Sequence, residues 1–242
     1  MKTRIAFEAP IGNTTFALEQ SDYIFAIAPM LGIPEYAEAV RRAREFGKKL
    51  YIDNGVYEGK LMGVDEYLEL CLHWKPEVVV APDVILNCCE TVGLSSEFLS
   101  KLPRKRPFEI MVVLQGRNDR EKIECYWELM KPFNFEIVGF GLAAFEKRWR
   151  ERMLFFVRMH TVGWKGRCHI LGLANLADLC FWSVFAESID TSLPFHLAQE
   201  GKELPFGQKE TKSIDWQDTL VGPRFDLATW NLDKVRKALD VR

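Results

Sequence analysis

Residues 78–83 are Val-Val-Val-Ala-Pro-Asp, a short apolar run that stops at a proline and a carboxylate. The run shows no polar alternation, which is typical of a strand in a parallel sheet that helices cover on both faces. Residues 111–116, Met-Val-Val-Leu-Gln-Gly, repeat the pattern with a glutamine and a glycine after the apolar part. Both stretches therefore predict buried parallel strands whose carboxyl ends carry polar side chains.

Similar runs occur along the whole chain, and helical periodicity fills most of the gaps between them. We expect strands at 3–8, 23–28, 49–53, 78–83, 110–115, 137–142, 169–173 and 188–192. Amphipathic patterns predict helices at 34–46, 64–73, 121–130, 147–159 and 233–239. Successive strands start roughly 20 to 32 residues apart, which is the length of a βα unit.

Eight strands alternating with helices in 242 residues predict a single (βα)8 barrel domain over residues 1–242. A doubly wound open sheet is the alternative, because one sequence does not show whether the sheet closes. The first run reaches the second through Asn13-Thr14-Thr15, without an evident helix. It is therefore expected either as a barrel strand or as an N-terminal capping hairpin.

Composition limits the classes of protein to which the chain can belong. The 32 basic and 34 acidic residues give a net charge of −2, which does not favour a global positive field for nucleic acid but permits a local basic face. No apolar run reaches the roughly 18 residues of a membrane span, and the N-terminus lacks the apolar core of a signal peptide, so we expect a cytoplasmic protein. The six cysteines form no CxxC pair and no Cys-His cluster, which favours buried thiols and no metal.

Polar residues that end the predicted strands are expected to converge. They are Asp53, Asp83, Gln115, Gly141 and Asp190. In a parallel barrel such positions share one rim, where active sites are built. A lone Asp after a strand is often a turn former or a helix N-cap, and a lone Gly permits a bend. Five such residues, each at the end of a different predicted strand, favour a common pocket.

The chemistry that these residues share suits a purine-like base. Gln115 offers an acceptor and two donors, and two carboxylates offer acceptors. The backbone N–H near Gly141 supplies a further donor, and Tyr57 is suited to stack on the ring. A third carboxylate on another strand is suited to attack an anomeric carbon, as in retaining glycosyl transfer.

Five short motifs between Leu50 and Phe195 support this interpretation. They are Asp53-Asn54-Gly55-Val56-Tyr57, Ala81-Pro82-Asp83, Val113-Leu114-Gln115-Gly116, Phe140-Gly141-Leu142-Ala143 and Ile189-Asp190-Thr191-Ser192-Leu193-Pro194. Together they resemble the motifs of the tRNA-guanine transglycosylase superfamily, whose members exchange guanine for a 7-deazaguanine on a (βα)8 barrel.

The resemblance implies a glycosyltransferase that needs no cofactor and inserts a preQ0-like or preQ1-like 7-deazaguanine. It implies Asp190 as the nucleophile that forms a covalent sugar–enzyme intermediate, and Asp53 as base contact and general acid/base. The residues implied to bind the base are Tyr57, Asp83, Gln115, Gly141 and Leu142.

The chain also departs from the tRNA enzymes of that superfamily. Asn54 and Val56 replace a Ser and a Gly, the chain is shorter, and no cysteine follows Cys180. The C-terminal zinc subdomain is therefore expected to be missing, and the pattern is more similar to the small phage and bacterial branch that modifies DNA.

We expect DNA and a free 7-deazaguanine as partners, with tRNA as the alternative polymer. A non-catalytic nucleic-acid-binding barrel or accessory subunit remains the alternative from another class, and the oligomeric state stays open.

Local basic clusters are candidates for contacts with the polynucleotide, and a solvated helix face is the alternative for each. His196 is a candidate to reach the pocket or a phosphate, with a solvated loop histidine as the alternative, and His169 is expected to be a satisfied core residue. The basic candidates are Arg117, Arg120, Lys147, Arg148, Arg150 and Arg152.

Overall fold

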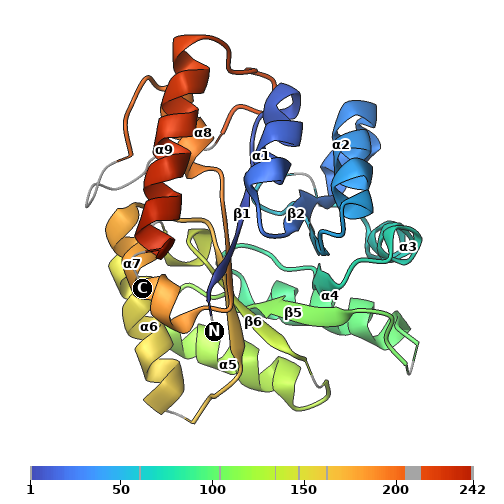
Figure 1. Ribbon diagram of the computed structural model, residues 1–242. Coiled ribbons are helices and arrows are strands. Elements are labelled where there is room, and N and C mark those ends of the chain that lie inside the picture. Colours follow the sequence, from blue (N-terminus) through green and yellow to red (C-terminus); the bar gives the residue numbers. More distant parts are fainter. Residues whose placement is uncertain are drawn as a thin grey trace.

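The computed structural model describes residues 2–59, 61–103, 105–133, 135–146, 148–161, 163–204 and 214–240 (Figure 1). Its strands are β1 (Arg4–Phe7), β2 (Ile24–Ile27), β3 (Leu50–Asp53), β4 (Val78–Val80), β5 (Glu109–Val113), β6 (Ile137–Gly141), β7 (Arg167–Leu171) and β8 (Ser188–Thr191). Its α-helices are α1 (Thr14–Gln20), α2 (Pro34–Glu45), α3 (Val64–Trp74), α4 (Cys88–Lys101), α5 (Asp119–Met130), α6 (Trp149–Thr161), α7 (Leu176–Phe185), α8 (Leu193–Gln199) and α9 (Pro223–Asp240). Short 3₁₀ helices are η1 (Ile11–Asn13), η2 (Ala28–Gly32) and η3 (Ala143–Phe145).

The eight strands form one parallel sheet in the order β1-β8-β7-β6-β5-β4-β3-β2. Hydrogen bonds link its two ends: Asp22 N donates to the Ile5 carbonyl and Phe7 N donates to Ser21 Oγ, both at 2.8 Å. The sheet is thus a nearly closed barrel with helices around its outside (Figure 1). The predicted (βα)8 fold is confirmed, and the open-sheet alternative is wrong.

The first strand belongs to the barrel, so the capping-hairpin alternative is also wrong. β1 pairs in parallel with β8, from Arg4 opposite Ser188 to Phe7 opposite Thr191. Helix α1 lies between β1 and β2, and at seven residues it is too short to show helical periodicity in the sequence. The predicted helices are found as α2, α3, α5, α6 and α9, although α9 begins well before residue 233.

Apolar side chains fill two spaces, one between the strands and the helices and one inside the barrel. The inner space holds aromatic side chains such as Tyr23, Phe25 and Tyr51, and the rings of Tyr23 and Tyr51 are 4.6 Å apart. Side chains from neighbouring strands stack there in layers, as in other barrels of this kind. The interior is therefore a packed core that supports the carboxyl-end rim.

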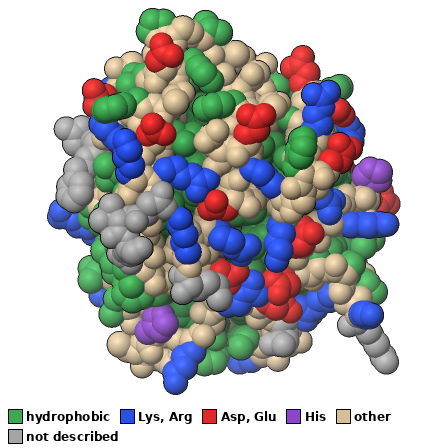
Figure 2. All heavy atoms as spheres, in the orientation of Figure 1, with side chains coloured by type: hydrophobic (Ala, Val, Ile, Leu, Met, Phe, Trp, Pro, Cys, Tyr) green, Lys and Arg blue, Asp and Glu red, His purple; other side chains and the backbone are tan. Residues whose placement is uncertain are grey.

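Charged side chains pair at the amino ends of the strands. Glu187 Oε1 accepts from Arg4 at 2.6 Å and from Arg167 at 2.8 Å, and Arg167 also donates to Glu109 at 2.9 Å. On the face of the molecule that Figure 2 shows, Lys and Arg side chains are likewise interspersed with Asp and Glu. Positive and negative charges therefore offset one another at this end of the barrel.

Arg152 of α6 is fully buried and joins the carboxyl ends of β6 and β7. Its Nη1 donates to the carbonyl oxygens of Phe140, Leu171 and Gly172 at 3.2, 3.1 and 2.9 Å, and its Nη2 lies 2.5 Å from Asp178 Oδ2. The prediction that Arg152 contacts nucleic acid is wrong, because the side chain lies on the face of α6 that packs against the strands. The ion pair instead fixes the loop after β7.

Replacing Arg152 by alanine should lower the free energy of unfolding by about 3–5 kcal/mol, because Asp178 is left as a buried charge without its cation. Chemical denaturation measures this loss. Arg150→Ala is the matched control on the exposed side of the same helix, and it should change stability by less than about 0.5 kcal/mol. Equal losses for the two variants would contradict the structural role of Arg152.

Candidate functional site

A pocket with a volume of about 130 Å³ opens at the carboxyl ends of the strands. It is lined by every residue predicted to act on or bind the base, namely Tyr57, Asp53, Asp83, Gln115, Gly141, Leu142 and Asp190. His196 also lines it, and so do residues that the sequence did not single out, among them Glu8, Phe25, Glu58, Leu171 and Gly172. The convergence expected of the strand ends is therefore present in the fold.

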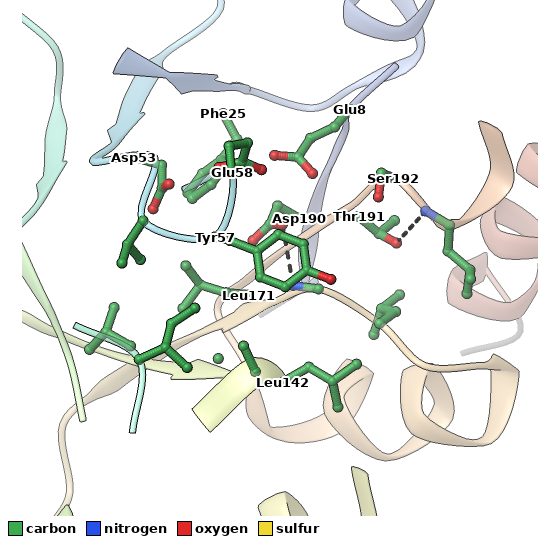
Figure 3. Close-up of a pocket in the computed structure, with 18 of the residues that line it drawn as sticks. Glu8, Phe25, Asp53, Tyr57, Glu58, Leu142, Leu171, Asp190, Thr191 and Ser192 are labelled. Carbon is green, nitrogen blue, oxygen red and sulfur yellow. Dashed lines mark hydrogen bonds between the residues drawn. The ribbon is translucent and has the colours of Figure 1, made fainter. Parts of the chain in front are cut away.

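Asp190 lies near the end of β8 and is buried. Its Oδ2 accepts from the backbone N–H of Gly172 at 3.2 Å (Figure 3). Its Oδ1 lies 2.9 Å from His169 Nε2. His169 is buried as predicted, but it contacts a functional carboxylate. Both oxygens of Asp190 thus have a partner, an arrangement that suits an ionised carboxylate.

Asp53 has a different environment from Asp190. It is the last residue of β3, and its Oδ2 accepts from the Gly55 N–H at 2.9 Å. Burial raises the pKa of Asp53 well above its usual value, and the nearby carboxylates of Glu58, Asp83 and Asp190 raise it further. A carboxyl whose pKa is raised in this way suits a general acid.

The turn after β3 explains why the motif contains a glycine. Gly55 has φ +81°, and a Cβ at this position would lie 2.7 Å from Pro29 Cδ. The Asp53 side chain accepts from Gly55 N, and the Asn54 Oδ1 accepts from Val56 N at 2.9 Å. Each side chain therefore bonds to the backbone two residues on, which fixes the turn that carries Tyr57.

Glu8 adds a carboxylate that the sequence interpretation missed. It follows β1, and its backbone N–H donates to the Thr191 carbonyl at 3.0 Å. Figure 3 shows the carboxyl groups of Glu8, Asp53, Glu58 and Asp190 on one side of the pocket, near the ring of Tyr57. Burial raises the pKa of Glu8 well above its usual value, and repulsion from Asp190, Glu58 and Asp53 adds to this effect.

Asp83 belongs to a buried hydrogen-bond network with two amides. Asn54 Nδ2 donates to Asp83 Oδ1 at 2.6 Å, and Gln115 Nε2 donates to Asp83 Oδ2 at 2.5 Å. Gln115 Oε1 accepts from Leu86 N at 2.9 Å, which fixes the orientation of the amide. Burial raises the pKa of Asp83 to about 6, although the two hydrogen bonds favour the carboxylate.

Gly141 and Leu142 line the pocket where β6 ends. The backbone N–H of Leu142 donates to the Leu171 carbonyl at 3.0 Å, so this donor is already used within the fold. A bound base would meet other groups of this segment. His196 of α8 is buried, and its Nε2 lies 3.7 Å from Glu200 Oε1. The side chain lines the pocket, which is one of the positions predicted for it.

The basic candidates for nucleic-acid contact lie outside the pocket lining. Arg117 is exposed in the loop after β5, on the side of the barrel where the pocket opens. Arg120 pairs with Glu124 at 2.8 Å, and Arg148 pairs with Glu151 at 2.8 Å. Lys147 lies outside the described residues. The exposed arginines remain candidates for contacts with a polynucleotide.

The described residues carry neither a cluster of metal ligands nor a membrane-spanning helix. Within them, no group of three or more His, Cys, Asp or Glu is arranged to hold a metal ion. No helix in the described ranges is long and apolar enough to cross a membrane. Cys71, Cys125 and Cys168 are buried, whereas Cys89 and Cys180 are exposed, so the prediction of a buried set is only partly correct.

No protein-family model and no curated protein matches this chain. The function of the pocket is therefore inferred from its own residues and from the motifs described above.

Replacing Asn54 by alanine should raise the pKa of Asp83 above about 6, by roughly one pH unit, because a hydrogen bond to the carboxylate is lost. Carbon-13 NMR of the aspartate carboxyl groups measures the midpoint. Asn118→Ala, in an exposed position before α5, is the control that should leave it unchanged. A fall in the Asp83 midpoint in Asn54→Ala would contradict the network.

Proposed function

We propose that this protein is a transglycosylase that exchanges guanine in DNA for a 7-deazaguanine. The observation that carries the proposal is that two carboxylates with different surroundings, Asp53 and Asp190, line one pocket. Two carboxyl groups whose environments separate their protonation states are suited to divide acid and nucleophile roles. The motif resemblance to the tRNA-guanine transglycosylase superfamily supports the same assignment.

The edge formed by Asp83 and Gln115 is suited to a guanine-like base. The Asp83 carboxylate accepts hydrogen bonds, and one Gln115 amide proton remains beyond the one donated to Asp83. A guanine-like edge carries ring and exocyclic N–H donors beside a carbonyl acceptor, so its donors match Asp83 and its carbonyl matches Gln115. The ring of Tyr57, which faces the pocket, is suited to cover the base (Figure 3).

The proposed reaction breaks one glycosidic bond and forms another in its place. An Asp190 oxygen attacks C1′ of the target deoxyguanosine, the C1′–N9 bond breaks, and guanine leaves with the proton of Asp53. The incoming 7-deazaguanine then gives its N9 proton to Asp53 and attacks C1′. The C1′–oxygen bond breaks, and its electron pair returns to the Asp190 carboxylate. No activated sugar is needed, because one base replaces another.

DNA is the polymer that we propose, with tRNA as the alternative outcome of the test. The departures at Asn54 and Val56 resemble the DNA-modifying branch of the superfamily. Exposed arginines such as Arg117 are available to contact phosphates beside the pocket. The target nucleotide must leave the base stack for C1′ to reach Asp190, because the carboxylate is buried.

Wild-type protein, supplied with 7-cyano-7-deazaguanine, should place the modified base in DNA, and Asp190→Asn should lower this exchange by roughly 10³-fold or more. Nucleoside mass spectrometry on separately digested DNA and tRNA measures the product in each polymer. Asp65→Asn, an exposed position on α3, is the control and should keep full activity.

Modified base in tRNA alone would retain the chemistry and overturn DNA as the polymer. Absence of product in both polymers, with folded protein and sufficient 7-cyano-7-deazaguanine, would favour a nucleic-acid-binding protein without catalytic activity.

Tyr57→Ala should weaken binding of free 7-cyano-7-deazaguanine by about 5- to 100-fold, because a base stacked on an aromatic ring loses that contact. Tyr57→Phe keeps the ring and should bind within a few-fold of wild type. Isothermal titration calorimetry measures both dissociation constants. If the Phe variant loses as much affinity as the Ala variant, the ring does not act by stacking.

A further inference from the structure

His169 of β7 is a buried polar residue inside the barrel, directly behind Asp190. Its side chain is fully inaccessible to solvent and does not line the pocket. The ring is stacked on Phe25, with ring centres 5.1 Å apart and an interplanar angle of 10°. This packing holds the imidazole in one plane, so its two nitrogens point in fixed directions.

Each nitrogen of His169 has one polar partner. Nε2 lies 2.9 Å from Asp190 Oδ1, and Nδ1 lies 2.8 Å from Ser188 Oγ. Ser188 and Asp190 are two residues apart on β8, so both side chains project to the same side of the strand. One strand therefore provides both partners of the imidazole.

The two partners of His169 favour one position for the imidazole proton. A carboxylate oxygen only accepts, so Nε2 serves Asp190 when it is the nitrogen that carries the proton. Nδ1 then has no proton and accepts from the Ser188 hydroxyl. The nearby hydroxyl of Tyr23, just before β2, donates to the Ile189 carbonyl at 2.8 Å. The carboxylate of Asp190, which only accepts, thus selects the tautomer, and the Ser188 hydroxyl is the donor to Nδ1 in it.

We propose that His169 is a positioning residue for Asp190, an inference that rests on the proposed function. The imidazole N–H and the Gly172 N–H each hold one oxygen of the nucleophile, so the carboxylate cannot rotate when the sugar approaches. When the C1′–oxygen bond breaks in the second half of the reaction, the returning electron pair arrives on a carboxylate that already has both donors. His169 acts only through Asp190, because its ring has no access to the pocket.

Two amide substitutions distinguish the contact made by Nε2 of His169 from the contact made by Nδ1. The side-chain nitrogen of Gln extends about as far as Nε2 and retains a donor for Asp190, whereas that of Asn extends only about as far as Nδ1. His169→Asn should lower the single-turnover rate of guanine release by about 10- to 100-fold, the range for one hydrogen bond to a charged group. His169→Gln should recover most of that loss. Neither variant should change the affinity for free 7-cyano-7-deazaguanine, and His73→Asn on the exposed side of α3 is the control.

Equal rates for His169→Asn and His169→Gln, in protein that folds like wild type, would overturn the proposal. A parallel loss of base affinity would also overturn it, because a purely structural role affects the whole pocket. If folded wild-type protein exchanges no base in DNA or tRNA, the proposed function fails instead, so the two failures are distinguishable.

A spectroscopic measurement tests the contact without relying on activity or on a variant that folds. In wild-type protein labelled with nitrogen-15 histidine, a long-range proton–nitrogen correlation should show His169 as the neutral tautomer with the proton on Nε2. Loss of the signal in His169→Gln assigns it. A proton on Nδ1 would overturn the proposal, since Asp190 would then lack its second donor.

Discussion

Parallel pairing of all eight strands is the constraint on which the site depends. Because every strand runs in the same direction, Asp53, Asp83 and Asp190 reach one rim although they are far apart in the sequence. The backbone N–H groups of Ile5 and Phe7 donate to the side chains of Asp22 and Ser21, which holds β1 beside the segment before β2, so the carboxyl end of β1 joins the same rim. Without this near closure the pocket would lose one wall.

The fold also creates the chemical difference between the two central carboxylates. Asp190 lies beside β7, which provides the imidazole of His169, and the next residue, Gly172, provides a backbone N–H, so both oxygens of Asp190 have partners. Asp53 ends β3 in a tight turn, where the Gly55 N–H is its hydrogen-bond donor and burial raises its pKa. Strand position thus separates a suitable nucleophile from a suitable acid, with no difference in residue type.

The sequence predicts the rim well and the interior poorly, for a physical reason. A polar residue directly after an apolar run is visible in the sequence, which is why Asp53, Gln115 and their neighbours were found. Glu8 has the same position after β1, but it was missed because that run was a candidate hairpin. The role of His169 depends on its pairing opposite Ser188, and strand register cannot be obtained from one sequence. Arg152 lies among other basic residues in the sequence, so the burial of its side chain could not be recognised there.

The two ends of the barrel use charge in opposite ways. At the amino ends, hydrogen bonds from Arg167 lower the pKa of Glu187, so charge there contributes to stability. At the carboxyl ends, burial and neighbouring carboxylates raise the pKa values of Glu8 and Asp53, and no described residue lining the pocket is Lys or Arg. Repulsion among these groups costs the free protein stability. In the proposed function, a base that brings several N–H donors to this rim would relieve part of that repulsion, so the repulsion in the free protein would strengthen binding of the base.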